Sequence, residues 1–284
     1  MDISLRYHSQ SHPIVLKEQN DVPFFVFPLL EGTGLVKHGF STRLGGVSQG
    51  YFSTMNLTFT TGDSRDSVLE NYRRIGGAMG IRPEHMVLSY QTHTTNIRRV
   101  TEEDRGKGIT RERDYRDVDG LITDVPGIAL VTFYADCVPL YFLDPVHRAI
   151  GLSHSGWRGT AERMGAKTVR AMEEAYGSRP EDILACIGPS ICQGCYEVSE
   201  DVAEQFMGSF PKEAHGSILE SGRAPGKYQL NLWQANQWVL TEAGIQRDHL
   251  AVTNVCTCCN PKVLFSHRAS KGKRGNLGAF LELA

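Results

Sequence analysis

Apolar residues recur at three- and four-residue intervals in four segments of the chain, the spacing that puts side chains on one face of an α-helix. In the first of these segments the apolar stripe includes Val68, Tyr72 and Ile75, and Asp63 or Ser64 is suited to cap the first turn. The expected helices are residues 64–79, 159–176, 198–206 and 232–243.

Short runs rich in Val, Ile, Leu, Phe and Tyr predict strands. Asp144 and Pro145 mark a tight turn between two of these runs, so residues 138–143 and 149–153 are expected to pair as a hairpin. The expected strands are residues 127–134, 138–143, 149–153, 183–187, 250–255 and 263–266, with a further strand-like stretch at 86–90. Strands and helices alternate in part, which predicts an α/β layered sandwich with a mixed sheet covered by helices on both sides.

Two polar segments interrupt these patterns, at residues 101–119 and 211–227, and both are expected to be loops. The chain contains no internal repeat, low-complexity tract or obvious linker. The prediction is therefore a single domain over residues 1–284.

The composition is that of a globular protein, with 284 residues, 40% hydrophobic and 22% charged. The net charge of −2 gives no overall attraction to nucleic acid or to an anionic membrane. No run approaches the roughly 18 apolar residues of a membrane-spanning helix. The first residues lack the apolar core of a signal peptide, and seven is an odd number of cysteines, so we expect a cytoplasmic protein with reduced thiols.

Chemistry concentrates at two histidines and one cysteine, which stand in short motifs flanked by glycine or alanine: His93, Cys137 and His154. Cys137 comes just before the first strand of the expected hairpin and His154 just after the second, so pairing would bring the thiol and the imidazole together. Two imidazoles and a thiolate form the protein ligands of a catalytic Zn²⁺, with a fourth position for water. The same residues also fit a Cys-His nucleophilic site.

The residue types suit zinc or copper, and zinc is favoured as the default in a reducing cytosol. A blue-copper site would also need an axial methionine, and no methionine stands close in sequence to the three residues.

Several polar residues beside glycine turns are candidate substrate contacts. Arg158 lies in the turn 156–160 that opens an expected helix, where free N–H groups and a cation would suit an anion. Arg43 precedes Gly45 and Gly46, and the contact set also includes Asn56 and Arg268. Asp136, next to Cys137, is the nearest candidate for a group that moves protons, although its side chain would equally serve to hold the loop.

The remaining thiols gather in two places, Cys256 with Cys258 and Cys259, and Cys192 with Cys195 and Cys186. We recognise no matching cysteine pairs at zinc-finger spacing, so a structural zinc finger is not expected. Buried, unreactive thiols are the favoured interpretation, and a redox role is the alternative.

Taken together, the motifs resemble those of the YfiH-like family, also called the laccase-domain or multicopper polyphenol oxidase family. The resemblance runs from about residue 36 to 284 and rests on seven segments: 38–48, 91–93, 117–123, 135–140, 154–160, 187–192 and 266–278. Gln-Thr-His at 91–93 departs mildly from the family's usual Gln-Val-His.

The resemblance implies a purine nucleoside phosphorylase that converts adenosine, inosine, guanosine or methylthioadenosine and phosphate to the base and ribose 1-phosphate, and that also deaminates adenosine. It implies a three-layer α/β/α fold shared with cysteine-hydrolase-like toxins, and one Zn²⁺ held by His93, Cys137 and His154. Zinc would lower the pKa of a bound water to about 7, which offers a route to deamination.

Three other functions remain open. The older family label implies a copper-dependent phenol oxidase. Some members are linked to correction of peptidoglycan precursors, which would suit a cysteine amidase with Cys137 as nucleophile and His154 as base. The third is a metal-binding or interaction module without activity. A nucleoside and phosphate are the expected partners, and neither a macromolecular partner nor an oligomeric state is predicted.

Overall fold

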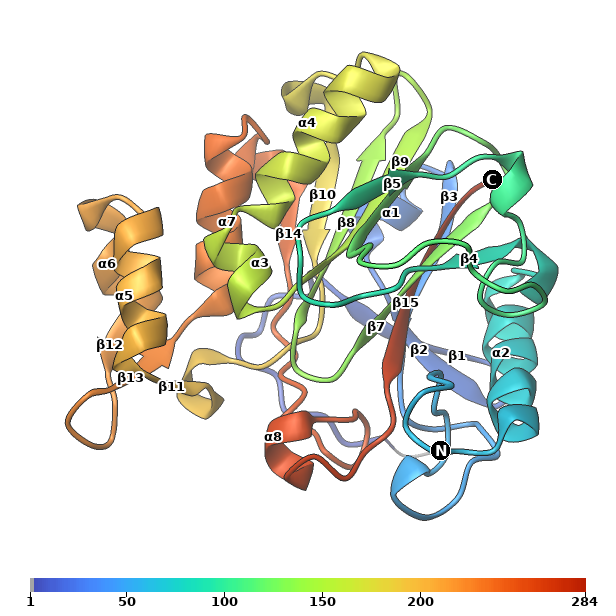
Figure 1. Cartoon of the computed structure of the whole chain (residues 1–284), viewed down its shortest axis with the longest axis horizontal. Helices are drawn as coiled ribbons and strands as arrows, with labels where there is room; N and C mark the ends of the chain where they lie inside the picture. Colours follow the sequence, from blue (N-terminus) through green and yellow to red (C-terminus); the bar gives the residue numbers. More distant parts are fainter. Residues whose placement is uncertain (1–2) are drawn as a thin grey trace.

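The computed structural model describes residues 3–284, and two mixed β-sheets packed face to face form its centre (Figure 1). The first sheet has the order β1-β2-β3-β15-β7-β4, formed by β1 (Val15–Gln19), β2 (Val22–Val26), β3 (Val36–Ser41), β15 (Leu277–Leu283), β7 (Ala129–Tyr134) and β4 (Met86–Leu88). The second has the order β14-β10-β8-β9-β6-β5, formed by β14 (Leu250–Val252), β10 (Leu184–Ile187), β8 (Val138–Asp144), β9 (Ala149–Ser155), β6 (Gly120–Thr123) and β5 (Ile97–Arg99).

Helices cover the outer face of each sheet (Figure 1). The helix α2 (Arg65–Met79) packs its apolar stripe against the first sheet. The helices α3 (Trp157–Ala161), α4 (Met164–Tyr176) and α7 (Leu232–Glu242) cover the second sheet. A lobe at one edge holds α5 (Glu200–Ser209), α6 (Lys212–Ile218) and the small sheet β11 (Glu197–Ser199), β13 (Lys227–Leu230) and β12 (Leu219–Ser221).

The remaining helical elements are single turns. Two short α-helices are α1 (Pro28–Glu31) and α8 (His267–Ser270). The 3₁₀ turns are η1 (Gly50–Phe52), η2 (Pro83–His85), η3 (Glu102–Asp104), η4 (Pro180–Asp182), η5 (Gln193–Cys195) and η6 (Arg247–His249). No helix in residues 3–284 is both long and apolar enough to cross a bilayer.

The expected hairpin is confirmed, and it lies in the second sheet. Strands β8 and β9 pair antiparallel, with Val138 opposite Ser155 and Pro139 opposite His154. Helices on both outer sides are also as expected, but two sheets separate them where a single mixed sheet was predicted. The side chains between the two sheets form an apolar core, and the central strands of both sheets therefore consist largely of buried residues.

Four predicted elements differ from the structure. The expected helix 159–176 is two helices, because Arg163 adopts a left-handed backbone with φ of 66° while its guanidinium contacts Glu242 and Ser209. The segment 198–206 begins as the end of β11, and the expected loop 211–227 contains α6 and β12. Residues 263–266 are not a strand, because the amides of Val263 and Leu264 both donate to Asn260 O and close a turn.

The strand β15 provides a test of the two-sheet core. Leu281 is fully buried between the sheets, so Leu281→Ala should lower the free energy of unfolding by about 2–5 kcal/mol in denaturant titration. The matched control is Val146→Ala in the exposed turn between β8 and β9, which should change stability by no more than about 0.5 kcal/mol. Equal midpoints for the two variants would contradict the position of β15.

Candidate metal centre

The three residues singled out from the sequence meet at one point. The ligand atoms of His93, Cys137 and His154 all lie within 4.8 Å of one another. Cys137 directly precedes β8, and His154 lies within β9, opposite Pro139. His93 comes from the loop after β4, so the centre joins both sheets. His154 is buried, Cys137 is partly buried and His93 is exposed, which leaves the centre open on one side.

A buried carboxylate, Asp119, fixes both histidines. Its Oδ1 accepts from His154 Nδ1 at 2.8 Å and from the backbone amide of His93 at 3.1 Å. Its Oδ2 accepts from the amides of Thr92 and Thr94. Because Nδ1 of His154 is engaged in this way, its Nε2 is the nitrogen available to a metal.

The backbone around the centre is also specialised. His93 and Asp136 have φ of 65° and 89°, a backbone conformation that residues other than glycine rarely adopt. At Gly156 a Cβ atom would lie 3.1 Å from both Cys137 Sγ and His93 Cδ2. A glycine is needed there so that the three ligands can approach one another.

In the metal-free protein, the thiol and the imidazole shift each other's pKa. Burial alone would raise the pKa of the Cys137 thiol, but His154 and His93 outweigh it and lower that pKa to about 6. Burial alone would lower the pKa of His154, but Cys137 and Asp119 outweigh it and raise that pKa to about 9. At neutral pH the pair is therefore thiolate and imidazolium, and thiolate is the form that binds metals and acts as a nucleophile.

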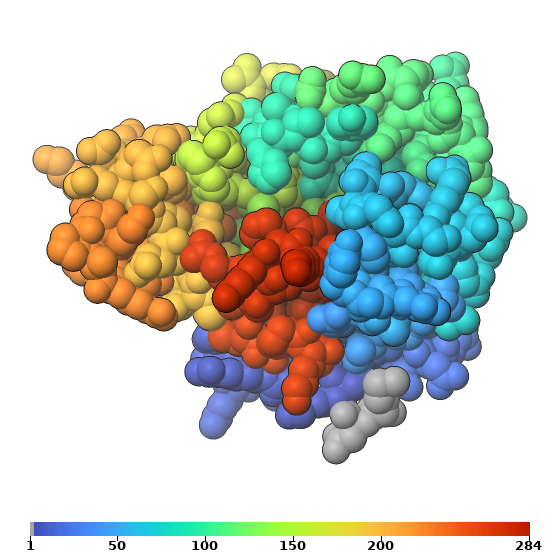
Figure 2. All heavy atoms as spheres, turned by 60° about the horizontal axis from the view of Figure 1, so that its bottom comes forward, coloured from blue at the N-terminus to red at the C-terminus, as the bar shows by residue number. Residues whose placement is uncertain are grey.

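A cavity of about 700 Å³ opens over the centre. Aromatic side chains line part of its wall: Phe59, Tyr90, Phe133, Trp157 and Tyr196. Three arginines also line it, Arg113, Arg268 and Arg274. Figure 2 views the side of the molecule on which α8 lies, where the C-terminal segment (red) separates the segment around residue 55 (light blue) from the orange lobe.

Of the substrate contacts expected from the sequence, Arg268 lines the cavity. Its guanidinium donates to Glu197 O and lies over the Tyr196 ring, 5.3 Å from the ring centre. The other three lie outside the cavity wall. They are Arg43, Asn56 and Arg158.

Each of these three has another structural environment. The Arg43 guanidinium donates to the carbonyls of Ser53 and Pro261. Asn56 is buried and accepts from the amide of Asn276, so it supports a segment of the cavity wall without facing the cavity. Arg158 is exposed and stacks on Trp157 at 4.4 Å.

Asp136 lines the cavity, but both its carboxylate oxygens accept hydrogen bonds. Oδ1 accepts from Thr257 Oγ1 at 2.7 Å, and Oδ2 accepts from the backbone amide of Arg268 at 2.7 Å. These bonds hold the loop that carries Cys137, the second of the two roles considered for this residue.

Sequence reasoning missed Asp119, Arg113 and Arg274. Asp119 lies in one of the motifs that carry the family resemblance, 117–123, and its position just before the apolar pair Leu121-Ile122 was the available signal. Arg274 lies just before Gly275; its Nε is buried without a hydrogen-bond partner, and burial lowers the pKa of its guanidinium. An unpaired buried donor on a cavity wall is typical of a group that binds a ligand.

The fold and this centre define a class: α/β proteins with a set of two histidines and one cysteine beside an open cavity. A family model described as "Multi-copper polyphenol oxidoreductase laccase" matches residues 37–284. The chain belongs to this family, as the motifs indicated.

Curated relatives extend over most of the chain. Purine nucleoside phosphorylase YlmD of Bacillus subtilis is 35% identical over 247 residues, which cover 86% of this chain and 87% of that protein. Purine nucleoside phosphorylase LACC1 of Mus musculus is 30% identical over 257 residues, covering 88% of this chain and 55% of that protein.

Solved structures agree with the fold. The crystal structure of the hypothetical protein YfiH of Bacillus licheniformis has a TM-score of 0.89 at 32% identity, covering 96% of this chain and 100% of that one. YlmD of Geobacillus stearothermophilus has a TM-score of 0.87 at 33% identity, covering 95% and 99%.

The role of Asp119 is testable through metal affinity. Asp119→Asn should weaken metal binding by about 10–100-fold, because the amide no longer supplies the charge that orients His154. The measurement is metal retained per chain during titration with a competing chelator. Asp117→Asn is the matched control, since the Asp117 carboxylate is exposed and, among residues 3–284, accepts a hydrogen bond from Thr92 Oγ1 alone. Equal retention by the two variants would contradict the assigned role.

Proposed function

We propose that the chain is a zinc-dependent purine nucleoside phosphorylase that also deaminates adenosine. The observation that carries the proposal is the meeting of His93, Cys137 and His154 beneath a cavity with both aromatic and arginine walls. The relatives named purine nucleoside phosphorylase support this choice of substrate. A volume of about 700 Å³ is in the range of small-molecule sites.

The donor set fits zinc, which His93, Cys137 and His154 would hold with one position left open. When bound there, zinc would supply a Lewis acid that polarises an oxygen of substrate or water. A blue-copper site would add an axial methionine or amide. None of the described residues lining the cavity is a methionine, and the Gln91 amide is engaged by Ser89 and Phe133.

The cavity walls suit the two groups that a nucleoside phosphorylase must bind, the purine base and the phosphate. The aromatic rings of Tyr90, Phe133 and Tyr196 line the cavity, and aromatic rings can pack against a purine. Arg268 and Arg274 offer guanidinium donors to phosphate, and a guanidinium binds two phosphate oxygens at once.

In phosphorolysis a phosphate oxygen bonds to C1′ of the ribose, and the bond from C1′ to the purine nitrogen breaks with its electron pair leaving on the base. The arginines would hold the attacking phosphate, and the aromatic walls would hold the departing base and exclude water. In deamination water adds at C6 and ammonia leaves, which requires proton movement near the centre. The hydrogen bonds of Asp136 favour a positioning role there over proton transfer.

The arginine assignment predicts a change in phosphate affinity. Arg274→Ala should raise the KM for phosphate about tenfold or more, a loss of roughly 1.5–3 kcal/mol for a charged hydrogen-bonded contact. Lys273→Ala, which removes the neighbouring exposed cation, should leave KM unchanged. A larger effect from Arg158→Ala than from Arg274→Ala would restore the contact expected from sequence and remove the one proposed here.

The reaction itself is tested with adenosine and a zinc-loaded sample. With phosphate, adenine and ribose 1-phosphate should form, and inosine should form separately. Without phosphate, release of the base should stop while inosine continues to accumulate. Cys137→Ala should lose both activities and the metal bound beneath the cavity. If the sample forms neither product but consumes oxygen with a phenol once copper is added, the oxidase replaces this proposal.

One observation favours a second candidate, a cysteine amidase acting on a cell-wall precursor. Cys137, His154 and Asp119 are arranged in the order of nucleophile, base and orienting acid, the arrangement found in cysteine hydrolases. The family resemblance implies a fold shared with cysteine-hydrolase-like toxins, which also favours this second candidate.

Metal removal separates the two candidates. An amidase should remain active after treatment with a chelator, and iodoacetamide should inactivate it at a rate that rises as pH increases through about 6, where the Cys137 thiolate forms. A phosphorylase of the proposed kind should lose activity with the chelator and regain it with zinc.

A further inference from the structure

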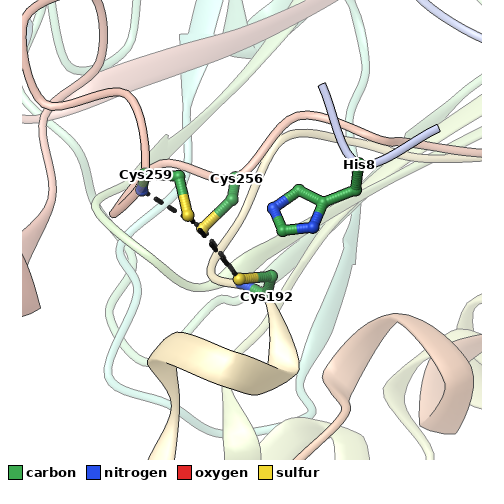
Figure 3. Close-up of side chains that lie close together, drawn as sticks. All are labelled: His8, Cys192, Cys256 and Cys259. Atoms are coloured by element: carbon green, nitrogen blue, oxygen red, sulfur yellow. Dashed lines mark hydrogen bonds between the residues drawn. The ribbon is translucent and has the colours of Figure 1, made fainter. Parts of the chain in front are cut away.

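A second group of metal-binding side chains lies away from the cavity. One ligand atom from each of His8, Cys192, Cys256 and Cys259 lies within 4.8 Å of the others. Figure 3 shows the three sulfur atoms facing one another, with the His8 ring beside them on the N-terminal segment. Cys192 and Cys256 are buried, Cys259 is partly buried and His8 is exposed.

The cysteine spacing is that of metal-binding loops, contrary to the expectation from the sequence. Cys192-Gln-Gly-Cys195 and Cys256-Thr-Cys-Cys259 are each a pair separated by two residues. This spacing lets two sulfurs from one tight turn approach the same ion. The second pair contributes both its sulfurs to the cluster, and the first contributes that of Cys192.

Two backbone amides point at the Cys256 sulfur. Its Sγ accepts from the amide of Cys192 at 3.2 Å and from the amide of Cys259 at 3.4 Å. These bonds orient the sulfur toward the cluster, as hydrogen bonds from outside a metal site orient its ligands.

The separation of the Cys192 and Cys259 sulfurs fits a shared ion and not a disulfide. In a tetrahedral site with Zn–S bonds of about 2.3 Å, two sulfurs stand about 3.8 Å apart. Cys192 Sγ and Cys259 Sγ are 3.9 Å apart. A disulfide would bring two sulfurs to about 2.05 Å, and all the cysteines are free thiols.

We propose that His8, Cys192, Cys256 and Cys259 bind a second Zn²⁺ in a closed, tetrahedral and structural site. Three thiolates and one imidazole select a soft divalent ion, and four protein ligands leave no position for substrate. This site does not depend on the reaction proposed for the cavity.

The site would tie three distant segments together. His8 lies beside residues 254–260, held by the bridge between Tyr7 and Val255 and by the bond from the His8 amide to Asn254 O. Cys192 follows Ile191, whose amide donates to Asp136 O at 3.0 Å and whose side chain lines the cavity. Thr257, next to Cys256, donates to the Asp136 carboxylate. An ion here would therefore stabilise the loop that carries Cys137.

Metal analysis of variants tests the site directly. The full-length protein is purified without chelator and dialysed against metal-free buffer, and zinc per chain is measured by plasma mass spectrometry. His8→Ala and Cys256→Ser should each retain about one zinc ion fewer than the unchanged protein. Cys195→Ser and Cys258→Ser are matched controls, because they remove neighbouring thiols outside the proposed set, and they should retain all the zinc. Cys137→Ser should keep the second ion, which separates this site from the cavity centre.

Cobalt provides a measurement that leaves all four proposed ligands of the second site in place. Protein refilled with Co²⁺ should show strong sulfur-to-cobalt absorption, and Cys137→Ser should retain most of it because three of the four thiolates belong to the second site. The proposal is overturned if this absorption disappears in Cys137→Ser, or if Cys195→Ser releases zinc and His8→Ala does not. A disulfide between Cys192 and Cys256 or Cys259 in freshly purified protein, found by peptide mass spectrometry, would also overturn it.

Discussion

The hydrogen bonding of the buried Asp119 carboxylate is the interaction on which the geometry of the candidate metal centre depends. It joins the loop of residues 92–94 to His154 in β9, and therefore joins one sheet to the other. A buried carboxylate oxygen without a partner is costly, and movement of the loop would remove the hydrogen bonds that Thr92 and Thr94 donate to Oδ2. His93 is thereby held at φ of 65°, a conformation that the loop alone would rarely adopt. The buried Asp119 carboxylate therefore holds His93, the most exposed residue of the candidate centre, in place.

The sequence predicted those parts of the molecule that local patterns determine. The helices α2 and α7 follow from apolar stripes, and the hairpin of β8 and β9 follows from two apolar runs around the Asp144-Pro145 turn. The hairpin was enough to bring Cys137 and His154 together, because antiparallel pairing fixes which residues are opposite. His93 was assigned to the centre because Cys137 and His154 formed a candidate ligand pair, and not because of the sequence around His93.

The remaining features depend on contacts between distant segments. Strands β3 and β15 were not predicted, because each places polar residues in buried positions: His38 accepts from the amide of Phe27, and Glu282 pairs with Lys37 at 2.8 Å. The same limit applies to the arginines. Arg43 and Arg274 both lie near glycines, but only packing decides that Arg43 faces backbone carbonyls while Arg274 faces the cavity. His8 is even less predictable, since its sulfur neighbours lie in the second half of the chain.

The position of β15 has a consequence for how the protein is made. This strand, Leu277–Leu283, lies between β3 and β7 and pairs with both. During synthesis the ribosome releases β3 and β7 long before β15, and until then neither strand has its partner on that side. The first sheet can close only after translation of β15, so we expect the apolar face that it shares with the second sheet to be incompletely covered in the nascent chain. Such late, non-local pairing slows folding and exposes the intermediate to aggregation. The nascent chain would therefore benefit from chaperones until β15 is in place.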